Sequence, residues 1–105
     1  MSIIRIALAQ INTAVGDFNG NLSKVINCLN KGRENNVDLV IFPELTTTGY
    51  PPEDLLLKNS FIEANLKMLK DIIQSSHGTG CIIGFVEGEK ELYNSAAFIY
   101  DGRLV

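Results

Sequence analysis

Four short apolar runs divide the chain, and each predicts a β-strand. The runs are residues 3–9, 38–42, 81–87 and 92–100. The first two are almost continuously apolar, which is typical of strands that are covered on both faces of a sheet. The last two are separated only by the polar turn 88–91, so we expect them to be antiparallel. Asp101-Gly102 is a strong hairpin signal and predicts that a further strand begins at Arg103.

Two segments between these runs have the 3.6-residue periodicity of amphipathic helices. The predicted helices cover residues 20–35 and 60–76. Their expected apolar faces are Leu22, Val25, Ile26 and Leu29 in the first helix, and Ile62, Leu66, Leu69 and Ile73 in the second. A helix between two strands that start about 30 residues apart is a βαβ unit, in which the two strands are parallel.

The ends of these helices carry recognisable signals. We expect Asn19 or Asn21 to cap the first helix. Ser60 begins a capping-box pattern at the second helix, and Gly78 is expected to adopt a left-handed conformation after it. The acidic, proline-led segment 51–57 predicts a short helical turn.

The strand over residues 38–42 directs attention to Glu44. Pro43 ends this strand, because it has no N–H for the sheet and holds Phe42 extended. Glu44 therefore follows the carboxyl end of a strand, where ligands bind in open α/β sheets. A carboxylate in a partly dry mouth has its charged form disfavoured, which suits a general base near neutral pH. From position alone, a solvated loop residue is the commoner case.

Composition narrows the class of protein. The chain has 105 residues, of which 46% are hydrophobic, and a formal net charge of −3, which indicates one ordered domain with a modest core. It has no basic stripe, so we expect no nucleic-acid partner. No apolar run approaches the roughly 20 residues that cross a bilayer, so we expect no membrane insertion. With no signal-peptide pattern and no disulfide framework, we expect a cytoplasmic protein.

Other reactive side chains have structural interpretations. Cys28 is expected at the edge of a helix core and Cys81 within a buried strand, where a thiol is inert. Lys58 and Lys90 lie in polar segments and are expected in solvent. His77, at a helix end, is also expected in solvent. No group of histidines, cysteines and acids has the spacing of a metal site, so we expect no metal.

The segment around Glu44 carries a family resemblance. Phe42-Pro43-Glu44-Leu45, followed by Gly49-Tyr50, resembles the first catalytic motif of the nitrilase, or carbon–nitrogen hydrolase, superfamily. The extension through residues 50–57 is narrower and is similar to the glutaminase domain of glutamine-dependent NAD+ synthetases. The segments Arg5-Ile-Ala-Leu-Ala-Gln10-Ile-Asn12, Val15-Gly16-Asp17 and Tyr93-Asn94-Ser95-Ala96-Ala97 fit the same family. The resemblance covers residues 1–105 and only the first part of such a domain.

This resemblance implies a fold and a chemistry. The fold is α/β, the N-terminal portion of a nitrilase-type four-layer αββα sandwich, with a mixed sheet and helices on one face. The family's Cys attacks the amide carbon, its Glu is the general base, and its Lys stabilises the oxyanion. Here Glu44 matches the Glu, whereas the Lys and Cys are implied beyond Val105. Residues 1–105 are therefore expected to form a partial domain that is catalytically incomplete alone.

The residues that follow Glu44 are given supporting roles. Thr46, Thr47 and Thr48 are expected to satisfy loop N–H groups and to hold the backbone at Glu44. Tyr50 lies where the family's glutamine pocket has its rim, so a packing or rim contact is expected there.

The implied activity is hydrolysis of glutamine, with ammonia passing to a synthetase domain. That domain would use ATP, with magnesium, to amidate nicotinic acid adenine dinucleotide, and no cofactor is expected within this segment. The resemblance also implies a homo-oligomer formed through helix faces. Two alternatives stay open: another nitrilase-superfamily amidase or carbamoylase acting on a different amide, and a non-catalytic α/β interaction module.

Overall fold

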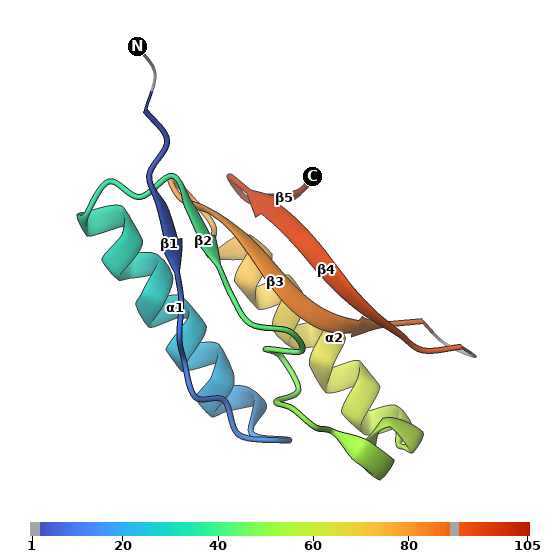
Figure 1. The fold of residues 1–105 in the computed structure, drawn as a ribbon. Helices are drawn as coiled ribbons and strands as arrows, with labels where there is room; N and C mark the ends of the chain where they lie inside the picture. The colour runs from blue at the N-terminus through green and yellow to red at the C-terminus, as the bar shows by residue number, and fades with distance from the viewer. Residues whose placement is uncertain (1–2, 89–90) are drawn as a thin grey trace.

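A computed structural model describes residues 3–88 and 91–105 and contains one sheet with two α-helices (Figure 1). The strands are β1 (Ile6–Leu8), β2 (Leu39–Ile41), β3 (Gly80–Glu87), β4 (Tyr93–Tyr100) and β5 (Arg103–Leu104). The helices are α1 (Phe18–Glu34) and α2 (Asn59–Gln74), and a short 3₁₀ helix, η1 (Glu53–Leu57), precedes α2. The four predicted strands, the two helices, the helical turn and the terminal hairpin are all present.

The strands follow one another in the sheet in sequence order, β1-β2-β3-β4-β5. β1, β2 and β3 are parallel, and α1 and α2 provide the crossover segments that parallel neighbours require. β4 is antiparallel to both β3 and β5. The β4–β5 turn is tight because Asp101 and Gly102 both have positive φ, at 51° and 77°. The predicted mixed sheet is confirmed.

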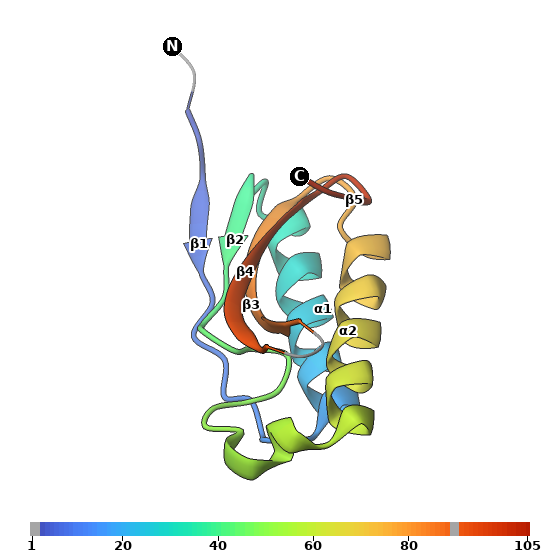
Figure 2. The same cartoon turned by 90° about the vertical axis from the view of Figure 1, so that its right-hand side faces the viewer.

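Both helices cover the same face of the sheet (Figure 2). Apolar side chains from both helices meet side chains from β2, β3 and β4 there, and form the core. Its members include Val25, Leu29, Met68, Leu69, Ile72, Val40, Cys81, Ile83 and Ile99. This arrangement confirms the predicted fold class, an α/β sheet with helices on one face.

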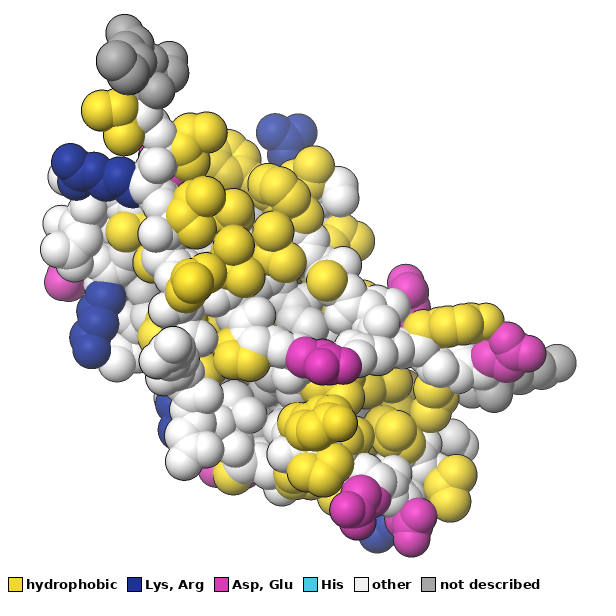
Figure 3. All heavy atoms as spheres, viewed as in Figure 1, with side chains coloured by type: hydrophobic (Ala, Val, Ile, Leu, Met, Phe, Trp, Pro, Cys, Tyr) yellow, Lys and Arg dark blue, Asp and Glu magenta, His cyan; other side chains and the backbone are white. Residues whose placement is uncertain are grey.

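The opposite face of the sheet is uncovered and apolar, and Figure 3 shows apolar side chains gathered over it. Ile6 and Leu8 of β1 are 56% and 71% exposed, and Phe98 of β4 is 44% exposed. Leu39 and Ile41, the register partners of Ile6 and Leu8, are only half-buried. The prediction that the first two strands are covered on both faces is therefore wrong for this chain, because α1 and α2 pack on one face only.

The first helix begins earlier than its asparagines suggested. Asp17 is its N-cap, and the Asp17 carboxylate accepts a hydrogen bond of 3.0 Å from the Gly20 N–H. The expected cap by Asn19 or Asn21 is therefore wrong. Asn21 is fully buried instead, because its amide is used in a loop contact described below.

The second helix also differs at both ends. Its N-cap is Lys58, whose backbone carbonyl accepts from the Phe61 N–H at 3.1 Å. Ser60 lies inside the first turn, so the capping-box prediction is wrong. Gly78 has the expected left-handed φ of 80°, but the helix already ends at Ser75, which is its C-cap.

The buried face of α2 is rotated from the predicted one. Leu69 is buried as expected, whereas Leu66 is 37% exposed, and Ile62 and Ile73 are only partly buried. The side chains that α2 buries are Phe61, Asn65, Met68, Leu69 and Ile72. Asn65 is the reason, because its fully hydrogen-bonded amide takes a central place on that face.

The uncovered face predicts self-association of the isolated chain, since exposed apolar surface of this kind marks an interaction site. Phe98→Ala should lower the association constant measured by sedimentation equilibrium. Ile99→Ala, one residue further along β4, should instead lower the free energy of unfolding by about 2–5 kcal/mol, because Ile99 is fully buried. Unchanged self-association in the Phe98 variant would contradict this account of the sheet face.

Candidate active-site loop

Glu44 lies in a turn that directly follows β2, and residues 43–49 are here called the Glu44 loop. The Phe42 N–H donates to the Ile82 carbonyl at 2.9 Å, which is the last backbone contact from this strand before Pro43 ends the pairing. The loop closes on itself, because the Gly49 N–H donates to the Leu45 carbonyl at 3.0 Å. The position of Glu44 beyond the carboxyl end of a strand agrees with the sequence prediction.

The Glu44 side chain has one identified partner. The Asn94 side-chain amide, from β4, donates a hydrogen bond to Glu44 Oε1. Glu44 is exposed in this chain, so the expected dry mouth does not form around it. The physical reason is that β4 carries Asn94 on the same side as the exposed Phe98, where the structure has no second layer.

The backbone of the loop passes very close to β3. A Cβ atom built on Gly84 would lie 2.4 Å from the Leu45 nitrogen and 3.0 Å from the Glu44 Cα. Only glycine, which lacks this atom, permits such an approach. Gly84 therefore allows the sheet to support the backbone on both sides of the Glu44–Leu45 peptide bond.

Three consecutive threonines are completely buried in this loop. The Thr46 hydroxyl donates to the Pro43 carbonyl, and the Thr48 hydroxyl donates to the Gly49 carbonyl at 2.9 Å. The Thr47 hydroxyl donates to Asn65 Oδ1 at 2.6 Å. The threonines hold the loop as expected, but their hydroxyls pair with oxygen acceptors and not with N–H groups. The Thr47 and Gly49 N–H groups are bound instead by backbone carbonyls.

From the sequence, Asn21 is expected only as an alternative cap of the first helix, and Asn65 and Asn94 are given no role. The sequence does contain a signal that Asn21 and Asn65 are buried and hydrogen-bonded, because each is a polar residue on an otherwise apolar helix face. Asn21 precedes Val25 by four residues, and Asn65 precedes Leu69 by four. Asn94 lies in a segment that contributed to the family resemblance, but its approach to Glu44 depends on strand pairing.

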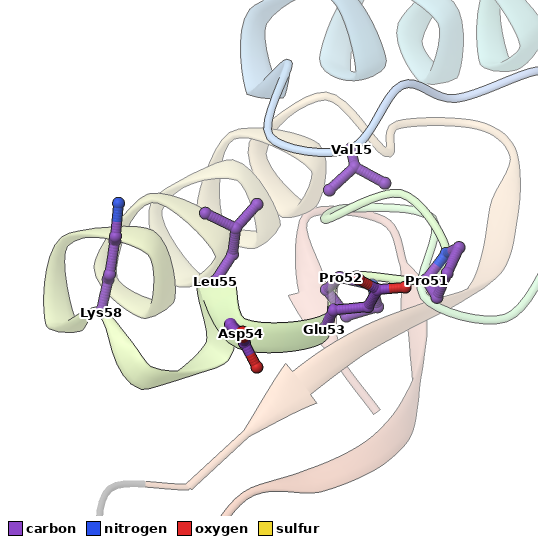
Figure 4. Close-up of a pocket in the computed structure, with 7 residues that line it drawn as sticks. All are labelled: Val15, Pro51, Pro52, Glu53, Asp54, Leu55 and Lys58. Atoms are coloured by element: carbon purple, nitrogen blue, oxygen red, sulfur yellow. The ribbon is translucent and has the colours of Figure 1, made fainter.

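The other residues considered from sequence lie apart from this arrangement. Lys58 is exposed and lines an open groove of about 440 Å³ with residues 51–55 and Val15, and Glu44 is not part of its lining (Figure 4). Tyr50 is 67% exposed, and Lys90 lies outside the described residues. His77 is exposed as expected, and its Nδ1 lies 3.5 Å from the Asp101 carboxylate.

The two cysteines have the structural roles expected of them. Cys81 is fully buried in the core between the sheet and the helices, and burial raises the pKa of its thiol to about 11. Cys28 is half-buried and packs against the same core. A thiol with a raised pKa is a poor nucleophile, so Cys81 is unsuited to covalent catalysis.

The described ranges, 3–88 and 91–105, bear on metal binding through their side chains and on membrane spanning through their helices. They contain no group of three or more His, Cys, Asp or Glu side chains arranged to hold a metal ion. Neither of the helices in these ranges combines the length and apolarity needed to span a membrane.

Comparison with known proteins places the chain in a family. A family profile for carbon-nitrogen hydrolases matches residues 5–105. The chain belongs to the carbon-nitrogen hydrolase family. The match runs from just before β1 to the end of the described structure, so it includes the Glu44 loop and every strand.

Individual relatives agree with the narrower resemblance. The glutamine-dependent NAD(+) synthetase of Thermotoga maritima is 41% identical over 107 residues, which cover 100% of this chain and 19% of the relative. The enzyme of the same name from Acinetobacter baylyi is 37% identical over 110 residues, covering 97% and 19%. A crystal structure of a glutamine-dependent NAD(+) synthetase from Cytophaga hutchinsonii has a TM-score of 0.93 at 26% identity, covering 98% of this chain and 18% of that one. The chain thus spans about a fifth of the length of these proteins.

Gly84→Ala should destabilise the chain by about 1–3 kcal/mol, because the new methyl group would force the Leu45 backbone to move. Urea unfolding would measure this loss. Gly80→Ala in the same strand is the matched control, since its Cβ would meet nothing nearer than 3.1 Å and should cost less. An equal loss in both variants would argue against the close approach at Gly84.

In the folded chain at pH 8, Cys81 should react with a thiol reagent more slowly than Cys28, as measured by peptide mapping of the labelled protein. Burial both covers Cys81 and raises its pKa from 9.0 to about 11. The folded thiol holds its proton more tightly than the unfolded one, so the protonated Cys81 contributes to the stability of the fold. This contribution is complete below pH 9.0 and is lost as the pH rises towards about 11. Faster labelling of Cys81 would contradict the assignment.

Proposed function

We propose that Glu44 is the general base of a glutamine amidohydrolase and that this chain forms part of a carbon-nitrogen hydrolase supplying ammonia for NAD+ synthesis. The observation that carries the proposal is the position of Glu44, beyond the carboxyl end of β2 on a loop anchored to β3, in a chain whose relatives are glutamine-dependent NAD(+) synthetases. A carboxylate held in this way is suited to repeated proton transfer.

The proposed reaction uses Glu44 twice. It first takes the proton of a cysteine thiol, and the thiolate sulfur attacks the amide carbon of glutamine. A lysine stabilises the tetrahedral oxyanion, and Glu44 gives the proton that it took to the amide nitrogen, so that the C–N bond breaks, ammonia leaves and a thioester remains. Glu44, again a carboxylate, then removes a proton from water, whose oxygen attacks the thioester. The C–S bond breaks, glutamate is released, and the proton passes from Glu44 to the cysteine sulfur. The hydrogen bond from Asn94 to Oε1 would orient the carboxylate in both half-reactions.

Under this proposal the chain is incomplete as a catalyst. Cys81 points into the core and Cys28 packs at its edge, so the nucleophile must come from elsewhere in the hydrolase, together with the lysine. ATP, magnesium and nicotinic acid adenine dinucleotide would be bound by a synthetase domain. Assembly of copies through helix faces stays a prediction.

The uncovered sheet face supports this interpretation over a self-contained interaction module. A module of that kind would need both faces of its sheet covered, whereas Ile6, Leu8 and Phe98 are exposed here. We propose that this face is covered by the remainder of the hydrolase domain. Detectable glutaminase activity from the purified 105-residue chain would contradict the proposed incompleteness.

The function is tested in a chimera in which this chain replaces the matching segment of the Thermotoga maritima relative. The chimera should hydrolyse glutamine, and Glu44→Gln should lower kcat by about 10²–10⁴-fold, because the amide cannot accept the thiol proton. Synthesis of NAD+ from added ammonium should continue in the variant, which shows that the rest of the protein is intact.

Glu34→Gln provides a matched control, since Glu34 is an exposed carboxylate at the end of α1. It should leave glutamine hydrolysis unchanged. A Glu44→Gln chimera that hydrolyses glutamine at the rate of the parent chimera would refute the proposed function.

A further inference from the structure

Thr47, three positions after Glu44, is bound to three different elements through its three polar groups. Its N–H donates to the Gly84 carbonyl of β3 at 3.3 Å. Its hydroxyl donates to Asn65 of α2 at 2.6 Å, and its carbonyl accepts from Asn21 of α1 at 3.2 Å. One buried residue therefore ties the Glu44 loop to the sheet and to both helices.

Asn65 and Asn21 each form two side-chain hydrogen bonds to the backbone of one other residue. Asn65 pairs with the backbone of Val86, accepting from its N–H at 3.0 Å and donating to its carbonyl at 2.7 Å. Asn21 pairs with the backbone of Ala14 in the same manner, with both bonds at 2.9 Å. Each asparagine is fully buried, and each binds Thr47 in addition. Paired backbone contacts of this kind fix the amide groups before they meet Thr47.

We propose that Thr47 is a positioning residue for Glu44, acting through its hydroxyl bond to Asn65. This inference rests on the proposed function, because it concerns the same general base. A shift of Thr47 would reach Glu44 through only a few residues, because the hydrogen bond from the Gly49 N–H to the Leu45 carbonyl closes the turn around Thr47. A displacement of about 1 Å in a catalytic group is enough to lower a rate about 10²-fold.

Thr47→Val removes the hydroxyl and keeps the shape of the side chain. Asn65 Oδ1 retains the Val86 N–H as a donor, so the variant leaves no buried acceptor without a partner there. The loop keeps its contacts through the Thr47 backbone to Gly84 and Asn21. Folding should therefore persist, while the restraint that α2 places on the loop is lost.

The experiment measures glutamine hydrolysis in the chimera described above for three variants. Thr47→Val should lower kcat about 10-fold with KM within about 2-fold, because a base that is displaced slows the chemical step. Thr47→Ser should restore kcat, since it keeps the hydroxyl. Thr79→Val is the matched control. Thr79 is equally buried, and its hydroxyl donates to the Val37 carbonyl at 3.1 Å. It directly precedes β3, at the start of the strand, whereas Thr47 binds further along it.

Hydrogen exchange in the same chimera gives a readout that does not depend on activity. The Gly49 amide should exchange faster in Thr47→Val than in the parent or in Thr79→Val. An unchanged kcat in Thr47→Val, an equal fall in Thr79→Val, or a failure of Thr47→Ser to restore kcat would each overturn the inference. These results are distinct from failure of the proposed function, which would appear as full activity in Glu44→Gln.

Discussion

The edge of β3 imposes the constraint on which the Glu44 loop depends. β2 pairs with β3 only as far as Ile82, while β3 continues to Glu87. The backbone groups beyond Ile82 on that edge would be buried without partners, which is costly. Thr47 binds the carbonyl of Gly84, and Asn65 binds both backbone groups of Val86. Satisfying this edge therefore fixes both the course of the loop and the placement of α2 against the sheet.

The same constraint explains why three consecutive threonines are buried beside a carboxylate. A turn that lies against a strand edge carries many backbone carbonyls, and threonine hydroxyls can bond to them while their methyl groups fill space. Among the described residues, no buried side-chain polar atom lacks a partner. The result is a loop with satisfied buried polar groups next to an exposed Glu44, which under the proposed function would hold the general base in place.

One face of the sheet is covered by the helices, and the other face is exposed to solvent. The helix-facing side holds the core, including Cys81, whereas the other side presents apolar residues and Glu44 to solvent. The sheet therefore lies between the buried Cys81 thiol and the exposed Glu44 carboxylate. The thiol that the chain buries is protonated and inert, and the carboxylate that it exposes lies where further protein layers would surround it under the proposed function.

The sequence by itself determined the α/β class, the approximate strands and helices, and the place of Glu44 after a strand, because periodicity and proline act over a few residues. The predicted apolar face of α1 is buried or half-buried, whereas only the tertiary structure decided which face of α2 is buried and what holds the loop. Asn65 lies 21 residues from Val86, and Glu44 lies 50 residues from Asn94. The polar position of Asn65 on an apolar helix face is a local signal, but the partners in both contacts are distant in sequence, because strand pairing brings remote backbone and side-chain groups to one edge of the sheet.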